Sequence, residues 1–132
     1  MPYDRTVKLT GTFEETVEAV RLALADQGFG VLTEIDVRAT LKAKLGHDME
    51  PYLILGACNP PLARQALDAD RSIGLLLPCN VVVRTEGDEV VVQAVDPAVM
   101  VTLAGVDAMA PVADEAGRRL DAALASLGTG GA

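Results

Sequence analysis

The feature that most constrains the fold is a pair of valine-rich runs separated by only two residues. The runs cover residues 75–86 and 89–95, and the Gly87-Asp88 pair between them has glycine first, as a type II′ turn requires. Two-residue turns of this kind join antiparallel neighbours in a sheet, so we predict a β-hairpin. Pro78 has no backbone N–H to give to a ladder, and its position predicts a sheet edge or a bulge.

Strand and helix patterns alternate over the first third of the chain. Residues 3–9 alternate loosely, as a strand does, and Thr12 and Glu15 then have the spacing of a capping box. A helix is predicted from this point, and Gly28 is expected to end it because glycine adopts the left-handed conformation at low cost. Residues 30–37 alternate again as a strand. In that strand one face is expected to carry Val31, Thr33, Ile35 and Val37.

The middle of the chain predicts a short helix, a buried strand and a longer helix. Residues 38–45 suit a short helix closed by Gly46, and the apolar run 52–57 suits a buried strand. Asn59 followed by two prolines is a typical helix start, with asparagine as the N-cap. The buried face of this helix is expected to be Leu62, Ala63, Ala66 and Leu67.

The C-terminal part is predicted to hold a linker and a final helix. We expect a linker from Asp96-Pro97 to Ala110, and a helix that begins near Pro111 and ends before Gly128. One side of that helix is expected to carry Ala113, Ala116, Leu120, Ala123 and Leu127. Residues 1–128 then form one domain, and residues 129–132 form a frayed tail.

The predicted order is β-α-β-(short α)-β-α-β-β-α, which is typical of an α+β domain with an antiparallel sheet covered by helices on one face. A length of 132 residues suits one domain, and a hydrophobic content of 50% excludes a disordered chain. No secretory signal and no apolar stretch of about 20 residues is present. We therefore expect a cytoplasmic protein without membrane association.

The charge of the chain is uneven. The net charge of −8 and the aromatic content of 3% count against nucleic-acid binding, which needs cations and stacking platforms. Against this background Arg38, Lys42, Lys44 and His47 form a basic island without an acidic residue. The island suits a small anionic ligand such as a phosphate or a carboxylate, although a solvated face that keeps an edge soluble is the simpler explanation.

Two Cys-Asn pairs are the most specific local motif. Cys58-Asn59 and Cys79-Asn80 each lie at the boundary of an apolar strand, and a helix begins directly after Cys58. Helix amides would favour the thiolate form of Cys58, so thiol chemistry with Cys79 as the resolving partner is one interpretation. The other is that both cysteines pack as small apolar residues. The two cysteines and His47 are residue types that bind metals, but their spacing matches no metal-binding motif. We therefore predict no metal, and we also predict no cofactor.

Catalytic motifs are sparse in the sequence. Glu34 and Asp36 share a strand face, and ion pairs with the nearby lysines are a simpler use for them than acid–base catalysis. Neither a nucleophile elbow nor a phosphate-binding glycine loop occurs. The pattern therefore favours binding over catalysis and leaves an enzymatic role open.

Five segments of the chain carry a family resemblance: residues 28–36, 41–46, 52–60, 73–83 and 95–97, with Met100 after them. Together they resemble one known family, the domain-of-unknown-function 302 (DUF302) family. The resemblance extends over nearly the whole chain. It implies a compact α+β domain similar to the TATA-box-binding-protein-like fold, and it implies homodimers. It implies no established activity, cofactor or catalytic residue.

The combined prediction is a small dimeric binding or accessory module for a small anionic ligand. Its site is expected where Lys42, Lys44 and the two Cys-Asn pairs converge, which requires the strands of Cys58 and Cys79 to be neighbours. Dimerisation also follows from a surplus of Val, Leu and Ala beyond the needs of one small core. The alternatives are a thiol-dependent redox or sulfur- or metal-handling protein that uses Cys58 and Cys79, and a purely structural, oligomerising module.

Overall fold

The computed structural model describes residues 3–130, and the side chains of residues 3–128. Five strands form one sheet in the order β1-β5-β4-β3-β2, and every neighbouring pair is antiparallel. The strands are β1 (Asp4–Leu9), β2 (Gly30–Asp36), β3 (Tyr52–Cys58), β4 (Cys79–Glu86) and β5 (Glu89–Val95). The α-helices are α1 (Phe13–Asp26), α2 (Val37–Leu45), α3 (Pro60–Ala69), α4 (Ala98–Ala104) and α5 (Ala110–Gly130). Two short 3₁₀ helices are η1 (Arg71–Leu76) and η2 (Asp107–Met109).

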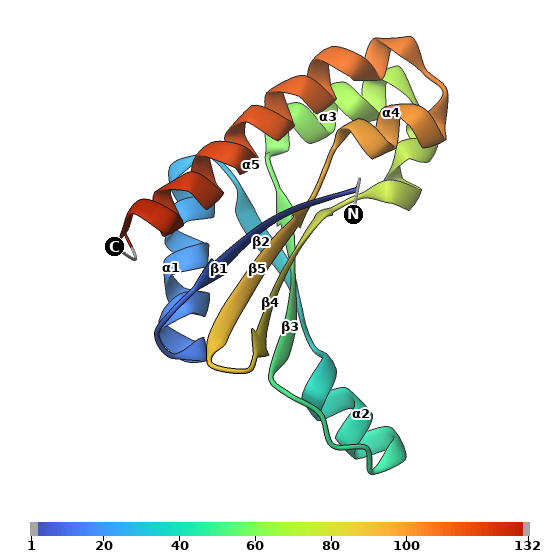
Figure 1. Ribbon diagram of the computed structural model, residues 1–132. Helices are drawn as coiled ribbons and strands as arrows, with labels where there is room; N and C mark the ends of the chain where they lie inside the picture. Colours follow the sequence, from blue (N-terminus) through green and yellow to red (C-terminus); the bar gives the residue numbers. More distant parts are fainter. Residues whose placement is uncertain (1–2, 131–132) are drawn as a thin grey trace.

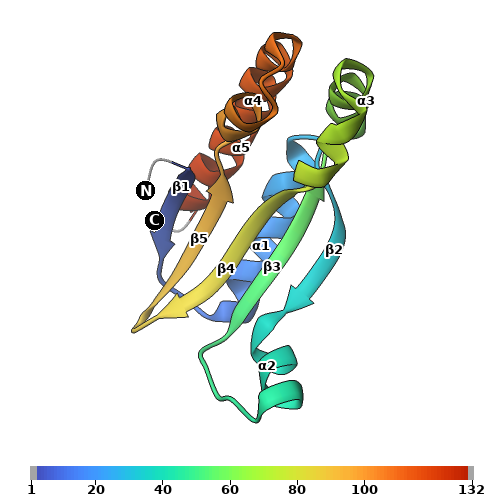
Figure 2. The same ribbon diagram turned by 90° about the vertical axis from the view of Figure 1, so that its right-hand side faces the viewer.

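Helices α1 and α5 cover one face of the sheet, which confirms the predicted α+β class (Figure 1). The core between them consists of inward residues from the strands, such as Leu55, Val83 and Val92, together with Val20 of α1 and Leu120 of α5. Among residues 3–130, no helix lies over the strands on the other face, which is turned toward the viewer in Figure 2. We call it the helix-free face. Strand register assigns to it Thr33, Ile35, Tyr52, Ile54, Gly56, Asn80, Val82, Arg84, Val91 and Gln93.

The local signals for α1 and for the hairpin act as the sequence predicts. The Thr12 hydroxyl accepts a hydrogen bond from the Glu15 amide at 3.1 Å, and Gly28 has a φ of +83° just past the helix end. Gly87 has a φ of +59°, and Glu86 pairs with Glu89 across the turn. The turn therefore sets the register of β4 against β5.

The expected edge position at Pro78 is wrong. Strand β4 lies between β5 and β3, inside the sheet, and it begins only at Cys79. The residues expected to open this strand instead form the end of η1, and the Leu77–Pro78 peptide is cis. Pro78 therefore removes no hydrogen bond from the ladder, because it precedes the first paired residue.

The expected faces of the second strand hold from Thr33 to Asp36 and are wrong at Val31 and Val37, and a bulge is the cause at Val31. The pairing of β2 with β3 shifts between Val31 and Thr33, so one extra residue enters β2. Val31 packs against the core, whereas Thr33 and Ile35 lie on the helix-free face. Leu32, at the shift, is 69% exposed. Val37 is no longer strand, because α2 begins there.

The expected linker after Asp96 is largely helical. Asp96 accepts a hydrogen bond from the Ala98 amide at 3.0 Å, α4 follows, and Gly105 ends α4 with a φ of +67°. Helix α5 begins at Ala110 and continues two residues past Gly128, to Gly130. All five residues predicted for its inner side are buried. The expected frayed tail thus overlaps the helix at residues 129–130, and residues 131–132 lie outside the described part.

Candidate functional site

The two cysteines lie beside each other at one end of the sheet. Cys79 pairs with Ala57, the residue directly before Cys58, so the strands of the two cysteines are neighbours as predicted. Both thiols are free. Cys79 shares the helix-covered face with Val81 and Val83 and is buried, whereas Cys58 is half-buried. The sequence echo of the two Cys-Asn pairs therefore marks one place in the fold.

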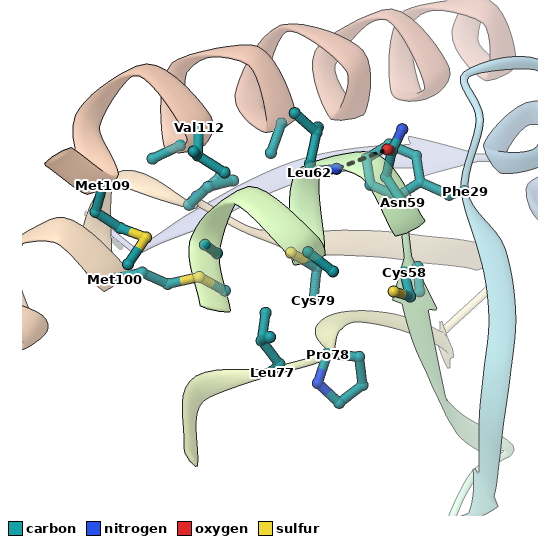
Figure 3. Close-up of a pocket in the computed structure, with 16 residues that line it drawn as sticks. Phe29, Cys58, Asn59, Leu62, Leu77, Pro78, Cys79, Met100, Met109 and Val112 are labelled. Atoms are coloured by element: carbon teal, nitrogen blue, oxygen red, sulfur yellow. Dashed lines mark hydrogen bonds between the residues drawn. The ribbon is translucent and has the colours of Figure 1, made fainter. Parts of the chain in front are cut away.

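A small apolar pocket opens at this end of the sheet (Figure 3). Its cavity volume is about 50 Å³, and its walls come from the ends of β3 and β4, the segment after η1, and helices α3, α4 and α5. Residues that line it include Phe29, Cys58, Leu62, Ala63, Pro78, Cys79, Met100 and Met109. None of the lining residues, all within the described part of the chain, is charged. A pocket of this size and polarity accepts a compact apolar group.

Four sulfur-bearing side chains line this pocket. Cys58 and Cys79 come from the sheet, Met100 comes from α4, and Met109 comes from η2 (Figure 3). Met109 is fully buried in a second core cluster with Ala66 and Ile73, and Met100 packs against that cluster. Flexible methionine side chains fill irregular spaces and adapt their shape, so this wall of the pocket can adjust to an occupant.

The buried environment makes Cys79 a poor thiolate. Burial, with a smaller contribution from the nearby Cys58, raises the pKa of the Cys79 thiol to about 11. At neutral pH the thiol is therefore protonated. Since the thiolate is the nucleophile in thiol exchange, Cys79 is not suited to attack a mixed disulfide formed on Cys58.

The two asparagines have different surroundings. Asn59 is only 6% exposed and caps α3, and its side-chain oxygen accepts a hydrogen bond from the Leu62 amide at 3.3 Å. This is the capping role that the sequence predicts, and it also sets the pocket wall at Leu62. Asn80 is exposed on the helix-free face, where it lines a shallow hollow with Tyr52 and Gln93.

The structure does not bring Lys42 and Lys44 to the cysteines of the same chain. Both lysines lie on α2, which follows Asp36, and Asp36 pairs with Leu53 near the start of β3. Cys58 ends β3, and five residues of strand span about 17 Å at roughly 3.3 Å per residue. Lys42 forms an exposed ion pair with Asp48 at 2.8 Å. The predicted convergence of all six residues within one chain is therefore wrong.

The two carboxylates of β2 find partners other than the expected lysines. Glu34 pairs with Arg21 of α1 at 2.7 Å, across the helix-covered face. Asp36 is the N-cap of α2 and accepts a hydrogen bond from the Ala39 amide at 2.8 Å. Both roles are structural, as the sequence argument favoured, although the partners differ.

Sequence reasoning missed the two methionines of the pocket because it assigned their segment to a linker. A helix signal was present there, since Asp96 and Pro97 precede seven residues of which all but Thr102 are apolar, and Gly105 follows them. Asp-Pro before a run and glycine after it are the usual start and stop signals of a short helix. With that helix recognised, Met100 becomes a candidate neighbour of α3 and α5.

Two further features of the described residues bear on the class of protein. None of the helices in this part is long and apolar enough to cross a membrane. Within the same residues, His, Cys, Asp and Glu side chains do not gather in groups of three or more that would hold a metal ion.

Fold and pocket together define a small α+β domain with a half-covered antiparallel sheet and a pocket at one sheet end. Residues 5–127 match the family model described as "Domain of unknown function DUF302", and the chain belongs to that family. A solved structure titled "Crystal structure of uncharacterized conserved protein DUF302 from Bacillus stearothermophilus" is similar, with 30% sequence identity and a TM-score of 0.89. The match covers 96% of this chain and 99% of that one. A search of curated proteins found no match.

Proposed function

We propose that the domain is a homodimeric binding module for a small organic anion whose apolar part enters the sulfur-lined pocket. The observation that carries the proposal is the pocket itself, which has apolar walls from both the sheet and three helices. The family name states no function, so the support comes from geometry. The proposal needs no cofactor, and it places the protein in the cytoplasm, where both thiols stay reduced.

The size of the pocket limits the apolar part of the ligand. A cavity of about 50 Å³ accepts a short alkyl group and excludes a fused ring system. Because the lining residues carry no charge, the anionic group must lie outside the pocket, near its mouth. Short-chain carboxylates, with an apolar tail and one acid group, have this shape.

Binding of the apolar part can be tested with 1-butanol as an uncharged probe in an NMR titration of the full chain. We expect shifts at the amides of Cys58 and Ala63, and loss of binding in Ala63→Met, which fills the pocket from α3. Ala122→Met, at an exposed position of α5, is the matched control and should bind as the unchanged chain does. Unchanged binding in Ala63→Met would refute the pocket as the site.

Dimerisation is the second part of the proposal, and the helix-free face supports it. This face leaves half-buried apolar residues such as Tyr52, Ile54 and Val82 without a covering helix. Sheets with one apolar face pack against another layer, and a second copy supplies one. In sedimentation at micromolar concentration we expect twice the chain mass of 13.8 kDa, whereas a mass near 13.8 kDa would refute the dimer.

A thiol carrier that uses Cys58 is a second candidate function. The observation in its favour is that the half-buried Cys58 lines a pocket together with Cys79. Alkylation with iodoacetamide, followed by peptide mass mapping, tests it. A carrier requires rapid modification of Cys58 in the folded protein at pH 7 to 8. An inert Cys58 would exclude the carrier and leave the binding module.

A further inference from the structure

Arg119 is a cation beside the pocket. It lies about one turn of α5 beyond Ala116, which lines the pocket, and therefore on the same side of that helix. Its Nε pairs with Glu115 at 3.0 Å, and its Nη1 donates to the backbone oxygen of Gln27 at 3.0 Å. Glu115 also pairs with Arg118, so its one negative charge is shared between two arginines.

The guanidinium of Arg119 keeps unused donors. A guanidinium has five N–H groups, and the contacts to Glu115 and Gln27 leave three of them without a partner among residues 3–128. The side chain of Arg119 is 40% exposed, so a ligand can reach these donors from solvent.

Asn59 carries a second unused donor at the edge of the pocket. It lines the pocket and is only 6% exposed, and its side-chain oxygen accepts from the Leu62 amide. Its side-chain nitrogen, Nδ2, donates no hydrogen bond to residues 3–128, yet it is not fully enclosed. Figure 3 shows this nitrogen on the side of the amide that faces away from Leu62. An acceptor from a ligand would satisfy a donor that is otherwise left unpaired in a nearly buried side chain.

Gly28 lets these two donors come together. A Cβ on Gly28 would lie 2.9 Å from Nδ2 of Asn59 and 3.0 Å from Nη1 of Arg119. The two nitrogens are therefore at most about 6 Å apart, a span across which one carboxylate can accept from both at about 2.9 Å each. Gly28 itself is exposed, and Phe29 directly after it lines the pocket. The paired donors thus lie between solvent and the apolar cavity.

We propose that Arg119 and Asn59 bind the carboxylate of the ligand beside Gly28 while its alkyl part lies in the pocket. This inference rests on the proposed function and names the charged group that the pocket walls lack. Arg119 supplies the cation and a planar set of donors, and Asn59 links that cation to the pocket wall, so one short ligand reaches both parts. The anion is then bound on α5 and at the start of α3, and not on α2.

Butyrate and 1-butanol, titrated separately into the full chain and followed by NMR, test the proposal. Asn59→Asp keeps an oxygen that caps α3, but it replaces the Nδ2 donor by a negatively charged acceptor. Arg119→Gln removes the positive charge. In each variant we expect the ratio of the butyrate affinity to the 1-butanol affinity to fall at least about tenfold. The ratio corrects for any change in the pocket itself.

Arg118→Gln is the matched control. It makes the same change of charge on the same helix and removes another partner of Glu115, but Arg118 is not among the nearest neighbours of Gly28. Its ratio should equal that of the unchanged chain. An equal fall in Arg118→Gln and Arg119→Gln would mean that total charge sets the affinity for butyrate, and would overturn the inference.

The remaining outcomes separate this inference from the proposed function. An unchanged ratio in either Asn59→Asp or Arg119→Gln overturns the inference and leaves the pocket as the proposed site. A chain that binds 1-butanol but not butyrate overturns it as well. A chain that binds neither probe removes the proposed function together with the inference.

Discussion

The two ends of the sheet are completed in different ways. At the end where β3 finishes, α3, η1, α4 and α5 enclose a second small core around Ile73 and Met109, and the apolar pocket lies beside it. At the other end, α2 leaves the sheet without burying a residue. One end is finished by its own chain, and the other presents the exposed Leu45 together with charged side chains of both signs, such as the Lys42–Asp48 pair.

This difference shows where the apolar surplus of the chain resides. The core between the sheet and α1 and α5 is filled by buried residues of the strands and of both helices. Exposed large apolar residues lie on several elements, among them Ile35 on the helix-free face, Leu45 on α2, Leu75 in η1, Leu22 on α1 and Leu103 on α4. The helix-free face adds the half-buried Tyr52, Ile54 and Val82, so it is the part of this surplus that forms a continuous surface for association.

The largest expected effect is on the free energy of unfolding, when one large aliphatic residue at each end of the sheet is replaced by alanine. Ile73→Ala leaves a cavity in the enclosed cluster and should lower the free energy of unfolding by about 2–5 kcal/mol. Leu45→Ala at the end of α2 should cost roughly 0.5 kcal/mol or less at protein dilutions that dissociate the proposed dimer. Urea unfolding measures both. Equal losses for the two variants at such dilutions would show that Leu45 packs within its own chain.

The next effect is a loss of stability at alkaline pH, and it comes from Cys79 at the end of the sheet where β3 finishes. The pKa of Cys79 is about 11 in the folded chain, against 9.0 for an ordinary thiol. The unfolded chain therefore releases this proton first, and the stability that the neutral thiol contributes is complete below pH 9 and lost as the pH rises to 11. The expected loss is about 2.7 kcal/mol, from two pH units at about 1.4 kcal/mol each.

Variants isolate this contribution from the other groups that titrate at high pH. Cys79→Ala should lack the loss, while Cys58→Ala should retain most of it, because burial is the main cause of the raised pKa. Unfolding free energies at pH 8, 9, 10 and 11 give the comparison. Parallel pH profiles for the unchanged chain and Cys79→Ala would mean that the thiol is not buried as described.

A smaller effect distinguishes the helix caps of the two ends. Asn59→Ala removes a buried cap from α3 and should lower the unfolding free energy by about 1 kcal/mol, with pocket binding weakened as Leu62 moves. Asp36→Ala removes the exposed cap of α2 and should reduce helix content with little loss of global stability. Hydrogen exchange of the α2 and α3 amides reports each one. Global destabilisation by Asp36→Ala would contradict an α2 that buries none of its residues.

Most of the fold followed from local signals that tertiary contacts did not override. The hairpin at Gly87, the capping box at Thr12 and the N-cap at Asn59 each act over a few residues, so their effect is visible in the sequence. The bulge after Val31 was not visible, because an extra residue in β2 is decided by its pairing with β3. The position of Pro78 likewise depends on where pairing begins.

The candidate site was predicted only where the residues lie on adjacent strands. Cys58 and Cys79 each stand at a strand boundary, and strand adjacency then brought them together. The placement of the lysines failed because the direction of β2 and β3, and not composition, decides the end from which α2 leaves the sheet. Met100 and Met109 were missed because their contacts span four elements of the enclosed end.

The most direct test of the central claim is an NMR titration of the full chain with butyrate and with 1-butanol. Ala63→Met fills the pocket from α3, and Ala122→Met at an exposed position of α5 is its matched control. We predict that the unchanged chain and Ala122→Met bind both probes and that Ala63→Met binds neither. Unchanged binding of both probes by Ala63→Met would show that the pocket is not the site, and would contradict the account.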